Sequence, residues 1–247
     1  MGNGLLSRGS VARLAAEGVV VVASILIAFA LDAWWAERQL EQEIAEDLAI
    51  VEYELAENIR LAQLTIDIMN EVVAANNTII AALEAQPDSA IVEVPDNTFF
   101  WGFFSNPTFD PSLGGTDAWI AAGRLAGIDS PELRQRLASV RGKVVDVREE
   151  QLVGRDISVF EIYPLIDDEI GDISVIQQMF TSGLHARQKT SVLPIPEQGT
   201  ISLPNSSALQ FLLRARAIWY ESSIHEMRDF QAELEEIQLL IQEEVGR

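Results

Sequence analysis

The sequence contains no cysteine, and only two of its 247 residues are histidines. Without cysteine, the chain forms no disulfide bond, has no thiolate nucleophile and offers no cysteine ligand for zinc or an iron–sulfur cluster. His185 and His225 lie far apart and no HExxH motif accompanies them, so no three-ligand zinc site is expected. Phosphate-binding loops and the GxSxG and SxxK motifs are also absent. The sequence therefore predicts a protein that is not an enzyme, with no cofactor and no metal.

Basic residues are scarce. Seventeen lysines and arginines stand against 38 aspartates and glutamates, which gives a formal net charge of −21. Charges balance within the first 35 residues, so the whole negative excess belongs to residues 36–247. Such a surface repels nucleic acid and anionic lipid headgroups, because it has no surplus cations to replace condensed counterions. We therefore expect no nucleic-acid partner.

Long apolar stretches are rare as well, and the main one is GVVVVASILIAFAL at residues 18–31. As a helix this run would span about 21 Å, which is short of the ~30 Å hydrocarbon core of a bilayer. Extension to residues 14–35 gives enough length if Glu17 and Asp32 lie near the two interfaces. Trp34 and Trp35 then lie at headgroup level, where amphipathic rings are favoured. We predict a transmembrane anchor at residues 14–35.

The charges that flank this segment predict its orientation. Arg8 and Arg13 precede it, whereas acidic residues dominate the first turns that follow. Positive charge favours the cytoplasmic side of a membrane. We therefore expect a single-pass protein of the bacterial inner membrane, with residues 1–13 in the cytoplasm and residues 36–247 as a periplasmic domain.

A cleavable signal peptide is the alternative interpretation of the same segment. Ala28-Phe29-Ala30 matches the small-x-small pattern of a cleavage site. Cleavage regions favour an extended backbone, however, and no proline or glycine occurs between Phe29 and Gln86 to interrupt a helix. We favour the anchor, and a mature N-terminus at Leu31 would overturn this choice.

Within the apolar segment, Ser24, Ala28 and Asp32 recur every four residues and so share one helix face. Small residues permit a close approach of two membrane helices, and an acid at membrane depth often marks a partner or proton site. The simpler alternative is that Asp32 marks the outer interface and is solvated. We expect this face to be a membrane-helix interface if the segment has a partner in the bilayer.

The residues after the anchor form a long helical pattern over residues 36–86, which Pro87 ends. Apolar residues recur in alternating steps of three and four, as in a heptad seam, which polar residues interrupt at Asn58, Thr65 and Asn76. Further apolar residues widen the stripe, so we expect packing against two or more neighbouring helices. The seam residues are Ile44, Leu48, Val51, Leu55, Ala62, Met69, Val72, Ile79 and Leu83.

The run IAFALDAWWAERQ, followed by this acidic helix, resembles a widespread group of uncharacterised bacterial single-pass membrane proteins. Those proteins share an N-terminal apolar stretch, an acid or amide beside tryptophan, then Glu-Arg and a helical stalk. The resemblance covers about residues 15–60. The segment FDPSLGGTDAWIAAGRLAGIDSPELRQRL is similar to a second recurrent piece, with Ala122 where that piece has serine. The resemblance implies an anchor and a helical exterior domain, and it transfers no catalytic residue.

An aromatic connector follows at residues 87–130, which four prolines break up. Its aromatic side chains suit either an exposed docking patch or ligand pocket, or a plug that closes the end of a helical bundle. We favour the plug, because a loop of this length needs packing to be ordered. The aromatics are Phe99, Phe100, Trp101, Phe103, Phe104 and Phe109. The alternation in AIVEV (90–94) predicts a short strand.

Residues 131–190 predict kinked helices that begin with the N-cap pair Ser130-Pro131. Pro164 should break or kink the helix near Tyr163. The basic face of this stretch is expected beside an acidic face, within the chain or in an oligomer. An acidic cluster at residues 167–172 lacks the spacing of a calcium loop, and we expect no metal there.

The last part of the chain predicts a hairpin over residues 191–205 and a return helix over residues 206–246. The hairpin should pair with AIVEV in a small distal sheet, and Ser207 with Gln210 fits a capping box. The predicted fold is all-α, with a transmembrane helix that continues into an elongated antiparallel helical bundle.

These features predict a membrane-anchored interaction or scaffold protein, an accessory or oligomerising subunit of an assembly. Expected partners are the lipid bilayer and either other membrane or periplasmic subunits or further copies of the chain. The alternative is a periplasmic ligand-sensing bundle with the aromatic connector as its pocket. A third class, a hydrolase, has no nucleophile–base motif to support it.

Overall fold

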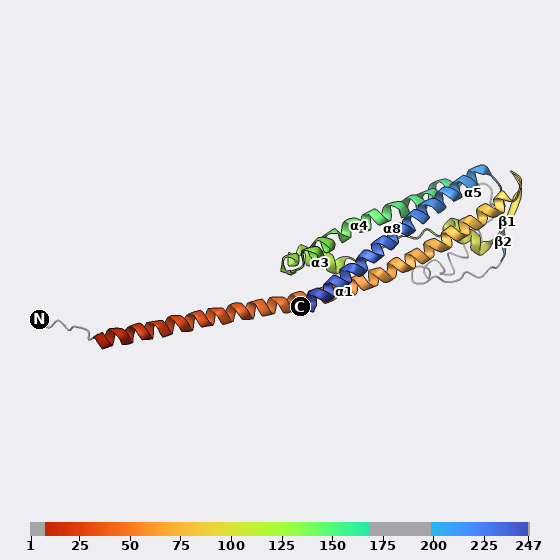
Figure 1. Ribbon diagram of the computed structural model, residues 1–247. Helices are drawn as coiled ribbons and strands as arrows, with labels where there is room; N and C mark the ends of the chain where they lie inside the picture. The colour runs from red at the N-terminus through yellow and green to blue at the C-terminus, as the bar shows by residue number, and fades with distance from the viewer. Residues whose placement is uncertain (1–7, 168–198, 247) are drawn as a thin grey trace.

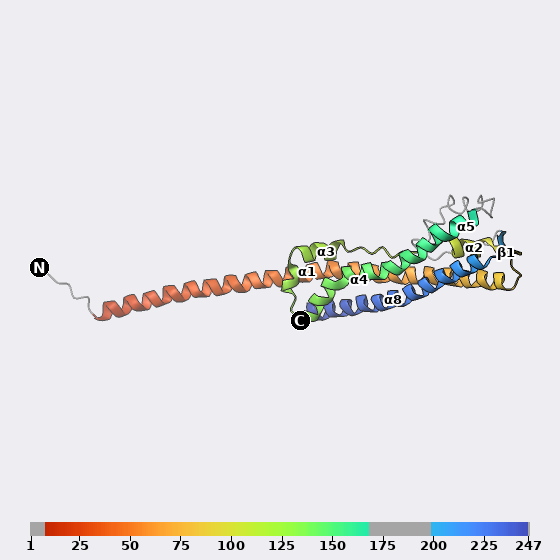
Figure 2. The ribbon, with the colours of Figure 1, turned by 90° about the horizontal axis from the view of Figure 1, so that it is seen from above.

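The computed structural model describes residues 8–167 and 199–246 (Figure 1). One helix, α1 (Arg8–Glu84), runs through most of its length with 77 residues. The first half of α1 projects alone, and its second half joins an elongated bundle in which α4 (Pro131–Asp156) and α8 (Ser207–Val245) lie alongside it (Figures 1 and 2). The predicted all-α fold is confirmed.

The projecting half of α1 is the helix, within the described ranges, that is long and apolar enough to cross a membrane. Its apolar residues are exposed, from Val19 at 68 % to Leu31 at 59 %. No backbone interruption separates this half from the bundle, because α1 is one α-helix. A membrane anchor and a signal sequence are both apolar helices of this length, so the structure shows an apolar helix that is compatible with either role.

The core of the bundle is formed by the predicted seam of α1 and by a second apolar seam on α8. In α1, the seam residues from Leu48 to Leu83 are buried, and only Ile44 at the open end is partly exposed. In α8, the seam residues are buried throughout, and they are Leu209, Leu213, Tyr220, Ile224, Met227, Phe230, Leu234, Ile237 and Ile241. Because α8 runs antiparallel to α1, these seams face each other along the bundle (Figure 1).

A two-stranded antiparallel sheet closes the far end of the bundle. Strand β1 (Ile91–Pro95) pairs with β2 (Thr200–Pro204), with Val92 opposite Leu203. Alternate side chains of both strands face inward and join the distal core, as the period-two pattern requires. The predicted pairing of AIVEV with the segment before α8 is thus confirmed, while residues 191–198 lie outside the described ranges.

Helix α4 begins as predicted, with the Ser130 hydroxyl accepting from the Leu133 amide at 3.2 Å and Pro131 at the first helical position. The expected break near Tyr163 takes another form, because helical structure continues through a π-helical segment, η3 (Ile157–Ile162), into α5 (Tyr163–Asp167). Pro164 has no amide hydrogen to donate, and the wider π turn before it absorbs that irregularity. The rest of the acidic cluster, residues 168–172, lies outside the described ranges.

The start of α8 corrects the predicted capping box. Ser206 is the N-cap, and its hydroxyl accepts from the Leu209 amide at 3.2 Å. Ser207 is already helical, and Gln210 donates to the Asn205 side chain at 2.8 Å instead of to a cap amide. Asn205 also donates to the carbonyls of Leu83 and Gln86, so it joins the end of α1 to the start of α8.

Candidate functional site

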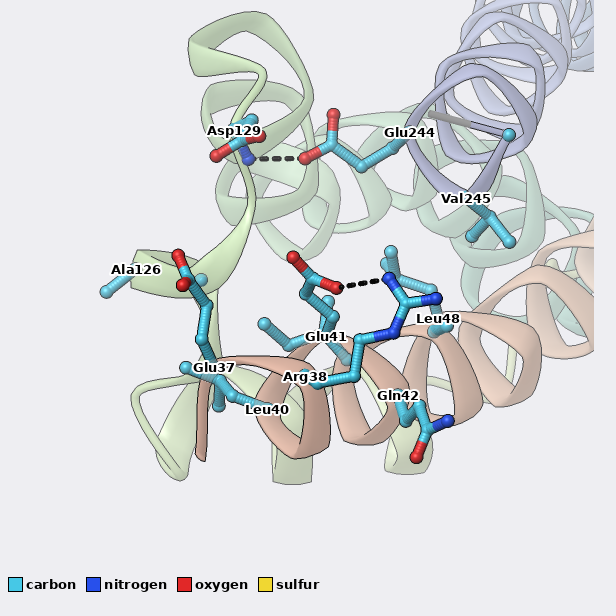
Figure 3. Close-up of a pocket in the computed structure, with 14 residues that line it drawn as sticks. Glu37, Arg38, Leu40, Glu41, Gln42, Leu48, Ala126, Asp129, Glu244 and Val245 are labelled. Atoms are coloured by element: carbon cyan, nitrogen blue, oxygen red, sulfur yellow. Dashed lines mark hydrogen bonds and ion pairs between the residues drawn. The ribbon is translucent and has the colours of Figure 1, made fainter. Parts of the chain in front are cut away.

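A groove of about 780 Å³ lies where α1 leaves the bundle (Figure 3). One wall is α1 over residues 37–48, the second is the loop at residues 126–129, and the third is the last turn of α8. The lining thus brings together the part of α1 that follows the apolar segment, the residues just before α4, and the last turn of α8.

The floor of this groove is apolar and tightly packed at one point. Ile44 and Leu48 line it from α1, and Leu40 and Val245 stand at its edges, each about half exposed. Gly127 approaches Ile44 so closely that a Cβ atom on Gly127 would lie 2.3 Å from the Ile44 Cδ1 atom. The absence of a side chain at Gly127 therefore allows the loop at residues 126–129 to pack closely against α1.

The rim of the groove is acidic. Glu37, Glu41, Asp129 and Glu244 line it with carboxylates, and among the described residues Arg38 is the one basic residue in the lining. Arg38 pairs with Glu41 at 3.4 Å, and because both side chains are more than half exposed this pair contributes little stability. Glu244 accepts from the backbone amides of Asp129 and Ser130, which fixes the loop at the start of α4 (Figure 3). The groove therefore presents an apolar floor under excess negative charge.

Above the groove, polar side chains of α1 hold the aromatic connector. Glu54 accepts from the amides of Gly115 and Thr116 at 2.7 and 3.1 Å, at the first turn of α3 (Gly114–Ala121). Asn58 bonds both the carbonyl and the amide of Ser112, at 2.6 and 3.0 Å. These contacts give the polar seam residue Asn58 a role within the chain, and they replace a cap that the connector's own sequence does not supply.

The connector's aromatic side chains lie mostly in the core. They belong to α2 (Asp96–Phe99), the π-helical segment η1 (Phe100–Phe104) and the loop that follows. Phe99, Phe100, Trp101, Phe103 and Phe109 are at most 7 % exposed, and Phe104 is partly buried and stacks on Tyr163 with 4.9 Å between ring centroids. These rings thus contribute buried area to the bundle, as a plug does, and little to an exposed surface.

A buried arginine lies between the two hydrophobic clusters of the bundle. The distal cluster lies beside the two-stranded sheet and includes Leu213, and the proximal cluster lies toward the apolar half of α1 and includes Tyr220. Arg216 lies between these two residues on α8 and has no exposed surface. Its guanidinium donates to the Gly102 carbonyl at 2.5 Å and to the Ser105 carbonyl, where η1 ends. Within the described ranges it makes no ion pair, so carbonyl dipoles take the place of a carboxylate.

Side chains supply further acceptors for the Arg216 guanidinium. The Asn106 and Asn76 side-chain oxygens accept from the guanidinium at 3.2 and 3.4 Å, and the Asn106 amide donates to the Tyr163 phenol at 3.0 Å. Burial lowers the pKa of Arg216 from its ordinary value and raises the pKa of Tyr220 and Tyr163. The arrangement ties η1, α1 and α8 together through one cation.

The predicted membrane-helix face is exposed along its whole length. Ser24, Ala28 and Asp32 contact no other helix of the described ranges, and the Ser24 hydroxyl donates to the Val20 carbonyl one turn back at 2.8 Å. Trp34 and Trp35 lie beside each other, 6.3 Å apart between ring centroids, and both are exposed. The structure therefore leaves this face and the two tryptophans available to a bilayer or a partner.

The basic residues of α4 pair largely with acids of α8 and the connector. Arg136 and Lys143 pair with Glu233 and Glu236 of α8, while Arg148 pairs with Asp110. Arg124 instead reaches the acidic stretch of α1 that follows the apolar segment, where it donates to Glu43 at 2.9 Å. The predicted neighbourhood of basic and acidic faces is thus present within the chain.

Sequence reasoning missed Arg216 and the groove. The signal for Arg216 was present, because it occupies a seam position between Leu213 and Tyr220 where an apolar residue is the rule. The groove carries no such signal, since it depends on how the loop at residues 126–129 and the last turn of α8 meet α1. Within residues 8–167 and 199–246, no group of three or more acidic, histidine or cysteine side chains is placed to hold a metal ion.

No protein-family model, curated protein or solved structure matches the chain.

Proposed function

We propose that the chain is a non-enzymatic, membrane-anchored interaction or scaffold protein, an accessory or oligomerising subunit of a membrane-associated assembly. The observation that carries this proposal is α1, one unbroken helix with an exposed apolar half and a second half that supplies a wall of the bundle core. An exposed apolar helix of this length is stable in a bilayer. Because the bundle shares the same helix, its distance from the bilayer surface is fixed by that helix.

The proposed location is the bacterial inner membrane, with the N-terminus in the cytoplasm and the bundle in the periplasm. Arg8 and Arg13 on one side of the apolar segment, and the acidic bundle on the other, support this orientation. The unbroken helix across Ala28 to Ala30 supports an anchor that is retained, because a cleavage site favours extended backbone.

The alternative, a ligand-sensing bundle with an aromatic pocket, receives less support. The aromatic rings that would line such a pocket are buried against α1 and the distal cluster. The groove at the base of the bundle is polar at its rim and open, which suits contact with another chain better than enclosure of a small molecule.

The test is extraction of the full chain from its native membrane in mild detergent, followed by native mass spectrometry of the intact particles. We expect a stoichiometric complex with at least one further membrane or periplasmic subunit or with further copies of the chain. A lone monomer that carries a small molecule would contradict the proposal. N-terminal sequencing of the same material decides between an anchor and a cleaved signal peptide.

A further inference from the structure

We propose that the groove at the base of the bundle binds a cationic, amphipathic segment of a different membrane subunit, at the point where that subunit's helix leaves the bilayer. This inference rests on the proposed function and names the kind of partner. It depends on three observations: the charge of the rim, the apolar floor, and the position of the groove next to the apolar segment of α1.

The rim determines the sign of the partner's charge. Within the part of the chain that the structure describes, the groove lining holds four carboxylates and one guanidinium, and that guanidinium, of Arg38, is already paired with Glu41. Because Glu37 and Glu41 are exposed, their repulsion from Asp129 and Glu244 is modest in water. A cationic partner would be attracted to these carboxylates and would offset their mutual repulsion. The attraction would become stronger as water leaves the groove, because the local dielectric constant falls.

The floor indicates that the partner also carries apolar side chains. Ile44 continues the seam that α8 covers higher in the bundle and is only partly buried, whereas the next seam residue, Leu48, is already buried, and Leu40 and Val245 remain about half exposed. A second helix that continues the line of α8 toward the membrane would cover Leu40, Ile44 and Val245 together. Such a segment needs apolar residues at helical spacing on one face and lysine or arginine beside them.

The position of the groove indicates where the partner comes from. Its lining begins at Glu37, two residues after Trp35. At about 1.5 Å per residue, the whole groove lies within roughly 20 Å of the end of the predicted membrane segment. A segment that has just left the bilayer reaches this height without a long linker.

A second copy of this chain does not fit. The corresponding segment of a second copy, residues 36–47, carries one arginine among many glutamates. Placed in the groove, it would bring carboxylates against carboxylates, which is unfavourable at an interface. The groove therefore discriminates against self-association and in favour of a basic partner.

The experiment uses the full chain in nanodiscs of zwitterionic phosphatidylcholine and three labelled helical peptides. The peptides share the same leucine and alanine positions and carry four lysines, four glutamines or four glutamates. Binding is measured by fluorescence anisotropy at about 0.15 M salt, where charges beyond about 8 Å are screened, and empty nanodiscs are the reference. We expect the lysine peptide to bind at least tenfold more tightly than the glutamine peptide, and the glutamate peptide not to bind.

Paired variants localise the binding. Glu37→Lys with Glu41→Lys reverses two rim charges, and Glu46→Lys with Glu71→Lys makes the same charge change on exposed positions of α1 outside the groove. We expect the first pair to weaken binding of the lysine peptide at least tenfold and the second pair to change it less than twofold. Equal weakening by both pairs would mean attraction to the general negative charge and would overturn the proposal, as would equal binding of the lysine and glutamine peptides.

A cross-linking control tests the exclusion of a second copy. Because the chain has no cysteine, Leu40→Cys and Tyr53→Cys each introduce a single thiol, the first at the groove and the second on exposed α1 surface. We expect no more disulfide-linked dimer from Leu40→Cys than from Tyr53→Cys. Preferential dimer formation through position 40 would overturn the assignment to a different subunit. The proposed scaffold function would survive either result, since it fails only if the native particle is a monomer.

Discussion

The guanidinium carbon of Arg216 lies 5.0 Å from the centroid of the Tyr220 ring, one helical turn farther along α8. The ring offers its negative face to a cation that has no exposed surface, and the η1 carbonyls accept its hydrogen bonds. The pair lies between the two hydrophobic clusters, so the middle of the bundle depends on a charge.

Arg216→Met should lower the free energy of unfolding by about 3 kcal/mol, because it leaves the Gly102 and Ser105 carbonyls buried without a donor. The free energy of unfolding of Arg216→Lys should lie between those of wild type and Arg216→Met, since one ammonium group cannot reach all the acceptors. Thermal unfolding followed by circular dichroism in detergent measures the change. Arg214→Met is the matched control, because Arg214 is half exposed and pairs with Glu84 at the surface. Equal loss in the two methionine variants would refute a special role for Arg216.

Gly154 packs against the Tyr220 ring, and a Cβ atom there would lie 3.0 Å from the ring's Cζ atom. Gly154→Ala should therefore destabilise the bundle by about 1–3 kcal/mol through overpacking. Gly142 lies on the same helix with no atom near its Cβ position, so Gly142→Ala should stabilise by about 0.5–1 kcal/mol. The two variants, compared in one denaturation series, should move in opposite directions. A gain in stability from Gly154→Ala would show that the Tyr220 ring can move to accommodate the methyl group and would contradict the prediction.

Glu54 supplies the acceptors for the first amides of α3. Glu54→Ala should cost about 1–2 kcal/mol and speed hydrogen exchange at Gly115 and Thr116, since those amides lose their only acceptors among the described residues. Glu57→Ala is the control, because Glu57 pairs only with Arg60 on the exposed face of the same helix. Unchanged exchange at Gly115 in Glu54→Ala would contradict the capping role.

Glu226 predicts one component of the pH dependence. Burial, together with the negative charges of Glu150, Asp146 and Glu149 on α4, raises the pKa of Glu226 above its ordinary value of 4.5. The protonated form is thus favoured in the folded state, so ionised Glu226 costs stability above the folded pKa, and the cost disappears as pH falls toward 4.5. Glu226→Gln should unfold at a higher temperature than wild type at pH 7.5, and the gap should close by about pH 4.

Glu93 supplies the control of opposite sign. Hydrogen bonds from the Ser202 and Thr200 hydroxyls lower the pKa of Glu93. Its contribution to stability is therefore present above pH 4.5 and is lost as pH falls through the folded pKa. Glu93→Gln should unfold at a lower temperature than wild type at neutral pH. If both glutamine variants shift in the same direction at pH 7.5, the assignment of Glu226 is wrong.

The periodicity of apolar residues in the sequence predicted most of the fold. The seams of α1 and α8 were readable because one buried face imposes a fixed spacing on apolar residues, and the alternation of AIVEV predicted β1. Features that depend on contacts across the fold were not readable. The cap of α3 comes from Glu54 about sixty residues earlier, and the N-cap of α8 is Ser206 although Ser207 offers the same chemistry.

The candidate site divides in the same way. The exposed face of Ser24, Ala28 and Asp32 follows from helical spacing alone. Arg216 contradicts the usual exposure of arginine, and its burial is made tolerable by the carbonyls at the end of η1 together with the Asn76 and Asn106 side chains. The groove is formed where the loop at residues 126–129 and the last turn of α8 meet the middle of α1, and no local pattern in the sequence reports such a contact across the fold.

The continuity of α1 makes it a lever. Beyond residue 35 the helix extends to Glu84, which is about 73 Å at 1.5 Å per residue. A tilt of about 20°, ordinary for a membrane helix, would sweep the distal sheet sideways by about 25 Å. Small changes in bilayer thickness would thus reach the far end of the bundle as large lateral displacements, and a subunit bound at the groove, close to the pivot, would remain almost in place.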